Sequence, residues 1–320
     1  MPQVPLLFPG QASQFVGMTA DLIARGGPGA GFLTRVDDIL GFGLARVMRE
    51  GPAELLTETR HAQPAIFAHS VAALLELRAL GVEPTAVAGH SLGEYAAAVA
   101  AGALDPADGL RLVRRRGELM FAAGRQRPGT MAAVMGLPAA RVAEVCAEVA
   151  ARTGVVVVAN HNSADQVAIS GEIAAVAAAG PALTAAGAKR VIPLPVSGAF
   201  HSPLLAGAAA EFAQDLGRVA LAEPRVPLYA NVSAAPVVTA AALREGLARQ
   251  LTAAVLWYDS LAAMIAGPAG GPAPGTFLEV GPGQVLSNLA KRAWRNVRFL
   301  PAGTAADLDT LLDSLAGSLT

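Results

Sequence analysis

A serine between two glycines is the first feature of this sequence that suggests chemistry. Residues 89–93 read G-H-S-L-G, which fits the pattern G-x-S-x-G around Ser91. They follow the apolar run 85–88 and precede the alanine-rich segment 95–101, an order that predicts a strand, a tight turn and a helix. Such a turn exposes the serine hydroxyl, and the helix directs its first N–H groups toward it. We therefore predict that Ser91 is a nucleophile with the Leu92 N–H as an oxyanion donor; an accidental turn serine is the alternative.

A serine nucleophile needs a base, and the chain has five histidines. His61 and His69 lie on an early helical segment, where we expect surface or core positions. His90 is beside the serine but points the other way if the turn is real, and His161 lies in an expected polar loop. His201 lies in a loop of small residues that leaves a predicted small domain, a common place for catalytic groups. The residues favour His201 and leave the choice of base open.

A run of arginines lies on the next predicted helix. Asp105 is a plausible N-cap and Pro106 fits the first helical position. Arg114, Arg115 and Arg116 follow on this helix. Taken by themselves, these three arginines are most simply a solvated helix face.

The elements around these residues predict an α/β fold with a mainly parallel sheet. Helical spacing extends over 44–80, with a break at Gly51-Pro52 and a further helix starting at Pro64. The stretch 266–275, rich in Gly, Pro and Ala, is expected to be a surface loop. Strands are expected at 4–8, 85–88, 226–231, 277–280 and 297–300.

A distinct block within this pattern has the order β-α-β-β-α-β, which is typical of a ferredoxin-like unit. We predict a small domain at 128–197, inserted into a large α/β-hydrolase-like domain formed by 1–127 and 198–320. Its expected strands are 131–135, 155–159, 166–170 and 189–194, and its expected helices are 138–151 and 172–186.

Composition excludes several classes of protein. The 24 Lys and Arg against 25 Asp and Glu give a net charge of −1, so charge does not suggest a nucleic-acid or membrane partner. The single cysteine, Cys146, is expected to be buried and permits neither an intrachain disulfide nor a cysteine-rich metal site. No apolar run predicts a membrane span, and the N-terminus lacks the features of a signal peptide. We expect a cytoplasmic monomer.

Six segments in order carry a resemblance to a known family. The chain resembles the malonyl-CoA:acyl carrier protein transacylases and the related acyltransferase domains of polyketide synthases, from Leu7 to about Arg292. The opening F-P-G-Q-A-S-Q is similar to the family's F-P-G-Q-G-S-Q, and G-H-S-L-G-E-Y has the family's form. The segments are 8–14, 89–95, 116–120, 160–163, 198–202 and 279–283.

The resemblance implies a role for each matching residue. Ser91 would attack the malonyl thioester of coenzyme A, and His201, oriented by a backbone carbonyl near Gln250, would be the base. The N–H groups of Gln11 and Leu92 would form the oxyanion hole. Arg116 would bind the malonyl carboxylate, because a guanidinium matches a carboxylate with two parallel donors. The coenzyme A thioester is a substrate, and no metal or redox cofactor is implied.

The resemblance also bears on residues around the acyl group and coenzyme A. Phe200 would restrict the space beside the acyl C2, and Asn160 and Asn162 are candidate contacts for substrate or coenzyme A. Ala12 replaces a glycine of the family's opening segment, and it is strained if the position has a positive φ. Gln284 stands where the family often has a basic residue, which bears on a contact with coenzyme A or the carrier.

We therefore predict malonyl transfer from malonyl-CoA to holo-acyl carrier protein, in fatty-acid synthesis. One alternative is a discrete acyltransferase that serves a polyketide synthase. Another is a serine hydrolase that removes acyl groups from carriers, although neutral acyl chains have no use for Arg116. A non-catalytic carrier-binding module is the third, and it would not require Ser91, His201 and Gln250.

Overall fold

The computed structural model describes residues 3–196, 198–267 and 273–316. Within these residues, six strands form one sheet in the order β10-β9-β1-β2-β7-β8, and every neighbouring pair except β7-β8 is parallel. The predicted mainly parallel sheet is therefore confirmed. Its strands are β1 (Gln3–Phe8), β2 (Glu83–Gly89), β7 (Leu228–Tyr229), β8 (Pro236–Val237), β9 (Thr276–Glu279) and β10 (Arg298–Pro301).

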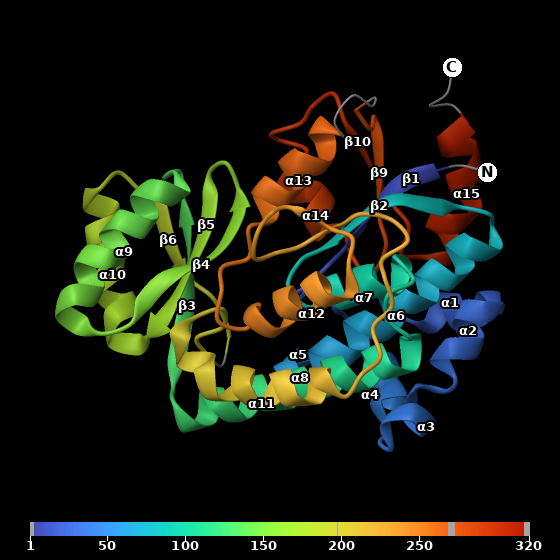
Figure 1. Ribbon diagram of the computed structural model, residues 1–320, viewed down its shortest axis with the longest axis horizontal. Coiled ribbons are helices and arrows are strands. Elements are labelled where there is room, and N and C mark those ends of the chain that lie inside the picture. The colour runs from blue at the N-terminus through green and yellow to red at the C-terminus, as the bar shows by residue number, and fades with distance from the viewer. Residues whose placement is uncertain (1–2, 197, 268–272, 317–320) are drawn as a thin grey trace.

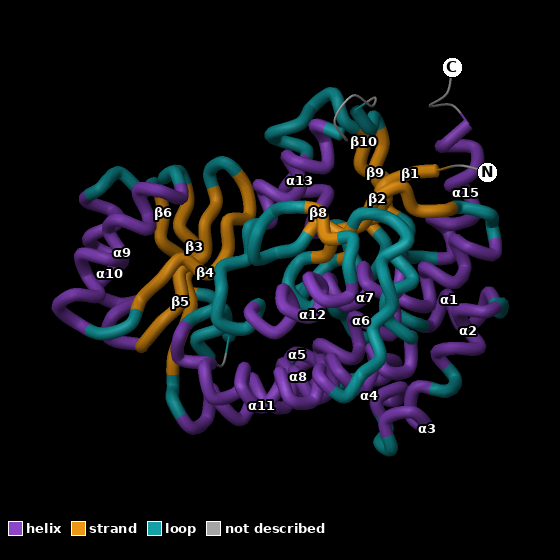
Figure 2. Tube along the Cα trace, in the orientation of Figure 1, coloured by secondary structure: helices purple, strands orange, loops and turns teal. Residues whose placement is uncertain are grey.

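Four antiparallel strands form a separate sheet in the order β4-β5-β3-β6. The chain order is β-α-β-β-α-β, as predicted, and a hydrophobic cluster of its own lies between the sheet and its two helices. Figure 1 shows this unit at one end of the molecule, with its helices on the outer side, and Figure 2 shows the strands as two separate groups. The elements are β3 (Gly129–Met135), α9 (Ala139–Thr153), β4 (Val156–Ser163), β5 (Gln166–Glu172), α10 (Ile173–Ala185) and β6 (Arg190–Pro193).

The remaining helices surround the large sheet, and three of them position the site. The helix α7 (Gly93–Ala100) follows β2 after a short turn, while α6 (Thr59–Ala79) and α8 (Pro106–Gln126) pack against each other. The other helices are α1 (Ala20–Arg25), α2 (Pro28–Leu33), α3 (Val36–Leu40), α4 (Leu44–Glu50), α5 (Ala53–Thr57), η1 (Pro203–Leu205), α11 (Ala206–Gly217), α12 (Ala240–Arg249), α13 (Trp257–Ala266), α14 (Val285–Ala290) and α15 (Ala305–Ala316).

The close contact between α6 and α8 depends on glycine. A Cβ built on Gly117 of α8 would lie 2.7 Å from the Thr59 carbonyl oxygen of α6, so only glycine lets the two backbones approach this closely. The start of α8 is as predicted: the Asp105 side chain accepts hydrogen bonds from two N–H groups of the first turn, and Pro106 occupies the first position. The start of the helix that contains the three arginines is thus fixed by its own sequence.

Three local predictions are wrong. Residues 160–163 continue strand β4 instead of forming a polar loop, because they pair with β5 and bridge to Val255. Pro64 does not start a helix but lies in the second turn of α6, where a proline removes one hydrogen bond of a 21-residue helix. The strand expected at 226–231 is reduced to Leu228–Tyr229. Much of the loop expected at 266–275 lies outside the described residues.

The four strands of the small sheet and the helices α9 and α10 lie within 128–197, the range predicted for the small domain, whose boundaries stay a prediction. Cys146 is buried, as expected, and burial raises the pKa of its thiol to about 11. In the described ranges, no helix is long and apolar enough to cross a membrane. The same ranges contain no group of three or more His, Cys, Asp or Glu side chains suited to hold a metal ion.

Candidate active site

The turn around Ser91 requires both of its glycines. Ser91 has a φ of 51°, in the left-handed region of backbone conformation that residues with a Cβ rarely adopt. A Cβ on Gly89 would lie 2.0 Å from the backbone carbon of Gly93, and a Cβ on Gly93 would lie 2.1 Å from the Phe8 carbonyl oxygen. The G-x-S-x-G pattern is thus explained by steric exclusion, which leaves the serine at the junction of β2 and α7.

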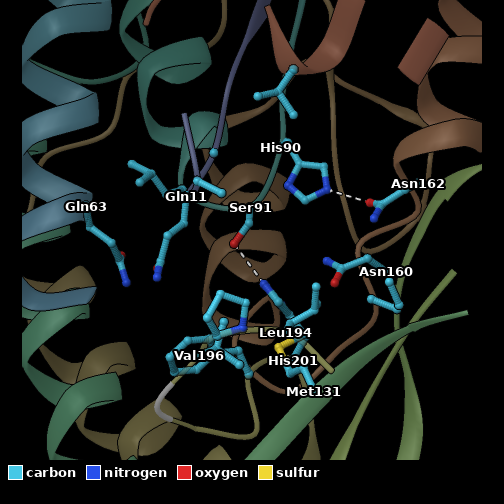
Figure 3. Close-up of a pocket in the computed structure, with 18 of the residues that line it drawn as sticks. Gln11, Gln63, His90, Ser91, Met131, Asn160, Asn162, Leu194, Val196 and His201 are labelled. Atoms are coloured by element: carbon cyan, nitrogen blue, oxygen red, sulfur yellow. Dashed lines mark hydrogen bonds between the residues drawn. The ribbon is translucent and has the colours of Figure 1, made fainter. Parts of the chain in front are cut away.

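Ser91 and His201 form a hydrogen-bonded pair. The Ser91 Oγ lies 2.8 Å from His201 Nε2, and His201 Nδ1 lies 2.9 Å from the carbonyl oxygen of Gln250. Because a carbonyl only accepts, Nδ1 carries the proton and Nε2 is free to accept one from the serine. Figure 3 shows this contact at the centre of the pocket. The arrangement is that of a nucleophile and its general base.

The environment keeps the His201 imidazole neutral. The ring is buried, and burial together with the charge of Arg116 lowers the pKa of His201 to about 3; the Gln250 carbonyl acts in the opposite direction. A neutral ring is the form that can accept the serine proton. His201 itself has a φ of 57°, so this loop, like the turn at Ser91, holds a strained backbone at the site.

Arg116 is buried beside the pair. It is 1% exposed, and its Nη2 donates to Ser91 Oγ at 3.0 Å and to the side-chain oxygen of Gln250 at 2.8 Å. Its Nη1 donates to Gln63 Oε1 at 2.7 Å. Within the described residues Arg116 makes no ion pair with a carboxylate, and its Nε has no hydrogen-bond partner. The guanidinium, which lines the pocket, is therefore a buried positive charge without an ionic partner in the described residues, the kind of group that can bind a carboxylate.

The other two arginines of the run are occupied elsewhere. Arg114 pairs with Glu118 and lies over the ring of Phe42, while Arg115 pairs with Asp215 and Glu211 of α11. The interpretation of this run as an ordinary helix face therefore fits these two arginines but does not fit Arg116.

A chain of hydrogen bonds links Arg116 to the loop after β1. Gln63 accepts from Arg116 and donates through Nε2 to the Thr59 hydroxyl at 2.9 Å. Thr59 in turn donates to the side-chain oxygen of Gln11 at 2.9 Å. The group that could bind a carboxylate is thus connected to the loop that contains Gln11.

Two backbone N–H groups at the pocket have no hydrogen-bond partner in the described residues. Among the hydrogen bonds of the described residues, none is formed by the backbone N–H of Gln11 or of Leu92, and both residues line the pocket with Ser91. Free N–H groups at a turn before a helix are suited to stabilise an oxyanion. Ala12, next to Gln11, has a φ of 81°, so the alanine does occupy the strained conformation considered from the sequence.

A pocket of about 320 Å³ lies between the two sheets. Eight of the predicted site residues line it, and the ninth, Gln250, lies behind them. Asn160 lines the pocket from β4, and the Asn162 side-chain oxygen accepts a hydrogen bond from His90 Nε2 at 2.9 Å (Figure 3). The eight are Gln11, Ser91, Leu92, Arg116, Asn160, Asn162, Phe200 and His201.

All five histidines lie in the described part of the chain, and His201 is the one that contacts Ser91. His69 is buried against the Gly303 carbonyl, and His61 contacts the Leu55 carbonyl. His161 pairs with Asp259 at 2.8 Å. His90, which also lines the pocket, donates from Nε2 to the Asn162 side-chain oxygen. In the described residues, His201 is therefore the candidate for the base.

Four polar residues of the site were not found from the sequence. Gln63 and Thr59 lie on α6, and Asn231 and Glu94 lie beneath the serine turn. The sequence does contain a signal for Glu94, because this residue follows Ser91 by three positions and lies in the first turn of α7. The other three lie far from Ser91 in the chain and have no sequence signal that we can identify.

Comparison with known proteins gives consistent matches. Residues 6–310 match the model of the acyl transferase domain family. The malonyl CoA-acyl carrier protein transacylase of Escherichia coli (strain K12) is 42% identical over 293 residues, which is 91% of this chain and 93% of the relative. The corresponding structure from Coxiella burnetii has a TM-score of 0.91 at 36% identity and covers 98% of each chain. A structure described as a type II polyketide synthase acyl-carrier protein in complex with its malonyl-transacylase has a TM-score of 0.91 at 37% identity, covering 98% of this chain and 100% of the other.

Proposed function

The chain belongs to the acyl transferase domain family and, within it, to the malonyl-CoA:acyl carrier protein transacylases, and from this premise we propose that it transfers malonyl from malonyl-CoA to the phosphopantetheine thiol of a holo-acyl carrier protein. The malonyl group would rest on Ser91 between the two half-reactions. Coenzyme A enters as the thioester substrate, and the chemistry uses side chains and backbone N–H groups of this chain.

The first half-reaction follows from the geometry of the pair. His201 Nε2 takes the Ser91 proton as Oγ forms a bond to the thioester carbonyl carbon. The N–H groups of Gln11 and Leu92 are the donors proposed for the oxyanion of the tetrahedral intermediate. When the C–S bond breaks, the His201 imidazolium returns its proton to the leaving thiolate. The second half-reaction reverses these steps with the carrier thiol, and malonyl leaves Ser91 as a new thioester.

The observation that carries the proposal is the buried Arg116 beside Ser91. A malonyl group has a carboxylate at the end away from the thioester, and the Arg116 guanidinium lies 3.0 Å from the atom that would bind the other end. A neutral acyl group would leave this buried charge without a partner, which is unfavourable in a site of low polarity. The same observation disfavours a hydrolase of neutral acyl chains.

The carrier and its pathway form the finer part of the proposal. The relatives named as transacylases support an acyl carrier protein as partner, and we propose fatty-acid synthesis in the cytoplasm as the setting. One structural relative is described with a polyketide synthase carrier, so a discrete acyltransferase of a polyketide synthase is the second candidate. The chemistry at Ser91 is the same for both, and only the carrier differs.

The test is intact-protein mass spectrometry after brief mixing with malonyl-CoA, acetyl-CoA or methylmalonyl-CoA. We expect a malonyl adduct that is absent in Ser91→Ala, weak in Arg116→Ala, and lost when holo-carrier protein is added. The mass of the carrier then increases by the same group. Carriers from fatty-acid and polyketide systems, compared side by side, distinguish the two settings.

Two results would contradict the proposal. One is the absence of a malonyl adduct together with a neutral acyl adduct that decays to free acid, which is the behaviour of a hydrolase. The other is a malonyl adduct of normal amount in Ser91→Ala, which would place the reaction at another residue.

A further inference from the structure

Glu94 is a buried carboxylate beneath the serine turn. It is 1% exposed, and within the described residues it forms no ion pair. Its Oε1 accepts from the Asn231 backbone N–H at 3.4 Å, and its Oε2 accepts from the side-chain amide of Gln250. Burial of a carboxylate with only neutral partners is costly. A role limited to packing would be served at lower cost by a neutral side chain, so the charge calls for an explanation.

The side-chain amide of Gln250 lies between two groups with opposite requirements. Its Nε2 donates to Glu94 and, at 2.9 Å, to the Ser91 carbonyl oxygen, while its Oε1 accepts from Arg116 Nη2 at 2.8 Å. A carboxylate only accepts hydrogen bonds, and a guanidinium only donates them. An ionised Glu94 therefore permits one of the two amide orientations, the one that presents an acceptor to Arg116.

The side-chain amide of Asn231 holds the other side of the turn. Its Oδ1 accepts from the Ser91 N–H at 2.7 Å, and its Nδ2 donates to the Gly89 carbonyl oxygen at 2.6 Å. Ser91 thus has both its N–H and its carbonyl bound to side-chain amides, and both amide residues contact Glu94. A residue with a φ of 51° needs such constraints from its surroundings.

We propose that ionised Glu94 is a positioning residue, which orients Gln250 and Asn231 and through them keeps the Ser91 turn and the Arg116 guanidinium in the geometry of malonyl transfer. The inference rests on the proposed function and deepens it, because it assigns the malonyl preference partly to a residue that does not touch substrate. Gln250 is the central link, since its backbone carbonyl also binds His201 Nδ1.

Protonation of Glu94 would remove its part of this constraint. Its new O–H would face the Gln250 Nε2, and turning that amide over would direct Nε2 at Arg116, donor against donor. Burial raises the pKa of Glu94 to about 7; the bonds from Gln250 and Asn231 and the charge of Arg116 act in the opposite direction. The neighbouring titratable group on α7 is Tyr95, whose pKa is raised by burial, so that its hydroxyl is neutral. We therefore expect the constraint that Glu94 places on Gln250 to weaken as the pH falls through about 7.

The test compares Glu94→Gln with Glu76→Gln. Glu76 is also buried and also accepts from a backbone N–H, that of Gly29 at 2.7 Å, but it lies on α6 away from the pocket. Rapid-quench mass spectrometry gives the rates of Ser91 acylation by malonyl-CoA and by acetyl-CoA, and thermal unfolding gives the stability of each variant. We expect Glu94→Gln to slow malonylation by about tenfold or more, because a misplaced reacting group costs this much. The malonyl-to-acetyl ratio falls with it, while Glu76→Gln keeps both rates.

A Glu94→Gln chain with the wild-type rate and ratio overturns the inference. If that variant is unfolded at the assay temperature, the wild-type chain decides: its malonyl-to-acetyl ratio should fall as the pH drops through about 7, and a constant ratio overturns the role of Glu94. A wild-type chain without any malonyl adduct contradicts the proposed function. An adduct in wild type with an unchanged rate in Glu94→Gln contradicts the role of Glu94 alone.

Discussion

The guanidinium of Arg116 contacts the hydroxyl of Ser91: Nη2 donates to Oγ at 3.0 Å. A fixed positive charge therefore lies against the atom that would attack a thioester. Burial, and after it this charge, lowers the pKa of the neighbouring His201. A carboxylate that binds this guanidinium must arrive next to Ser91, because the two groups are in contact. The group that would recognise the acyl carboxylate is thus in direct contact with the nucleophile.

Arg116→Ala should remove the preference for malonyl. Truncating one partner of a buried, hydrogen-bonded charge pair costs about 2–5 kcal/mol. The transition-state stabilisation derived from kcat/KM should therefore fall by this amount for malonyl-CoA and by less for acetyl-CoA. The control is Arg115→Ala on the same helix, whose ion pairs with Asp215 and Glu211 lie outside the pocket. Equal losses for malonyl-CoA and acetyl-CoA in Arg116→Ala would contradict carboxylate recognition.

Thr59→Val should slow acylation without weakening substrate binding. The hydroxyl of Thr59 accepts from Gln63 and donates to the Gln11 side chain, so its loss frees the loop that carries a proposed oxyanion donor. Complete loss of such a donor costs about 2.7–4 kcal/mol in kcat, and a loosened donor should cost part of this. We expect kcat to fall for every acyl-CoA with KM nearly unchanged, and Thr59→Ser to restore it. A change in KM alone would show that Thr59 does not act through the loop.

The local pattern of the sequence predicted most of the fold. The two arrangements of strands follow from apolar runs, Gly and Pro positions and the β-α-β-β-α-β order. The sequence alone predicts a loop at residues 160–163 because their polar side chains mask a strand that pairs with β5 through the backbone. The sequence alone predicts a helix start at Pro64 because propensity does not show that the packing of α6 against α8 outweighs one lost hydrogen bond.

At the site, the sequence revealed residues with a local motif and missed those without one. Ser91 lies in a turn that its flanking glycines specify, and Arg116 and His201 lie in recognisable segments. Asn231 and Gln63 reach the site only through the packing of distant elements, and no spacing in the chain reports that. Glu94 was visible in the motif, but its burial and its two amide partners required the structure.

Ala12→Gly should stabilise the protein. Ala12 is exposed and has a φ of 81°, a conformation that costs a residue with a Cβ about 1–2 kcal/mol. Glycine removes this strain but increases the entropy of the unfolded chain, so the net gain should be up to about 1 kcal/mol in the free energy of unfolding. The control is Ala178→Gly, exposed within α10, which should lose about 1 kcal/mol. Denaturant unfolding measures both, and a loss in Ala12→Gly similar to that of Ala178→Gly would contradict the strain.

The pH dependence of stability should show that His201 is neutral in the folded chain. Its pKa is lowered from 6.5 to about 3, first by burial and then by Arg116. Below pH 6.5 His201 therefore binds a proton in the unfolded chain but not in the folded chain. The free energy of unfolding decreases as the pH falls toward 3. The slope should approach about 1.4 kcal/mol per pH unit from this residue. Denaturant unfolding of His201→Asn should show a shallower dependence than wild type, with the similar effect of His69 left in both.

The same depressed pKa separates His201 from Glu94 in the kinetics. Because the imidazole stays neutral well below pH 6.5, loss of the wild-type acylation rate near neutral pH should come from protonation of Glu94, whose pKa is about 7. Glu94→Gln should therefore acylate slowly but at a rate that does not change with pH through 6.5. A midpoint near 6.5 in that variant would mean that His201 takes up a proton at its ordinary pKa and that its burial does not exclude the charge.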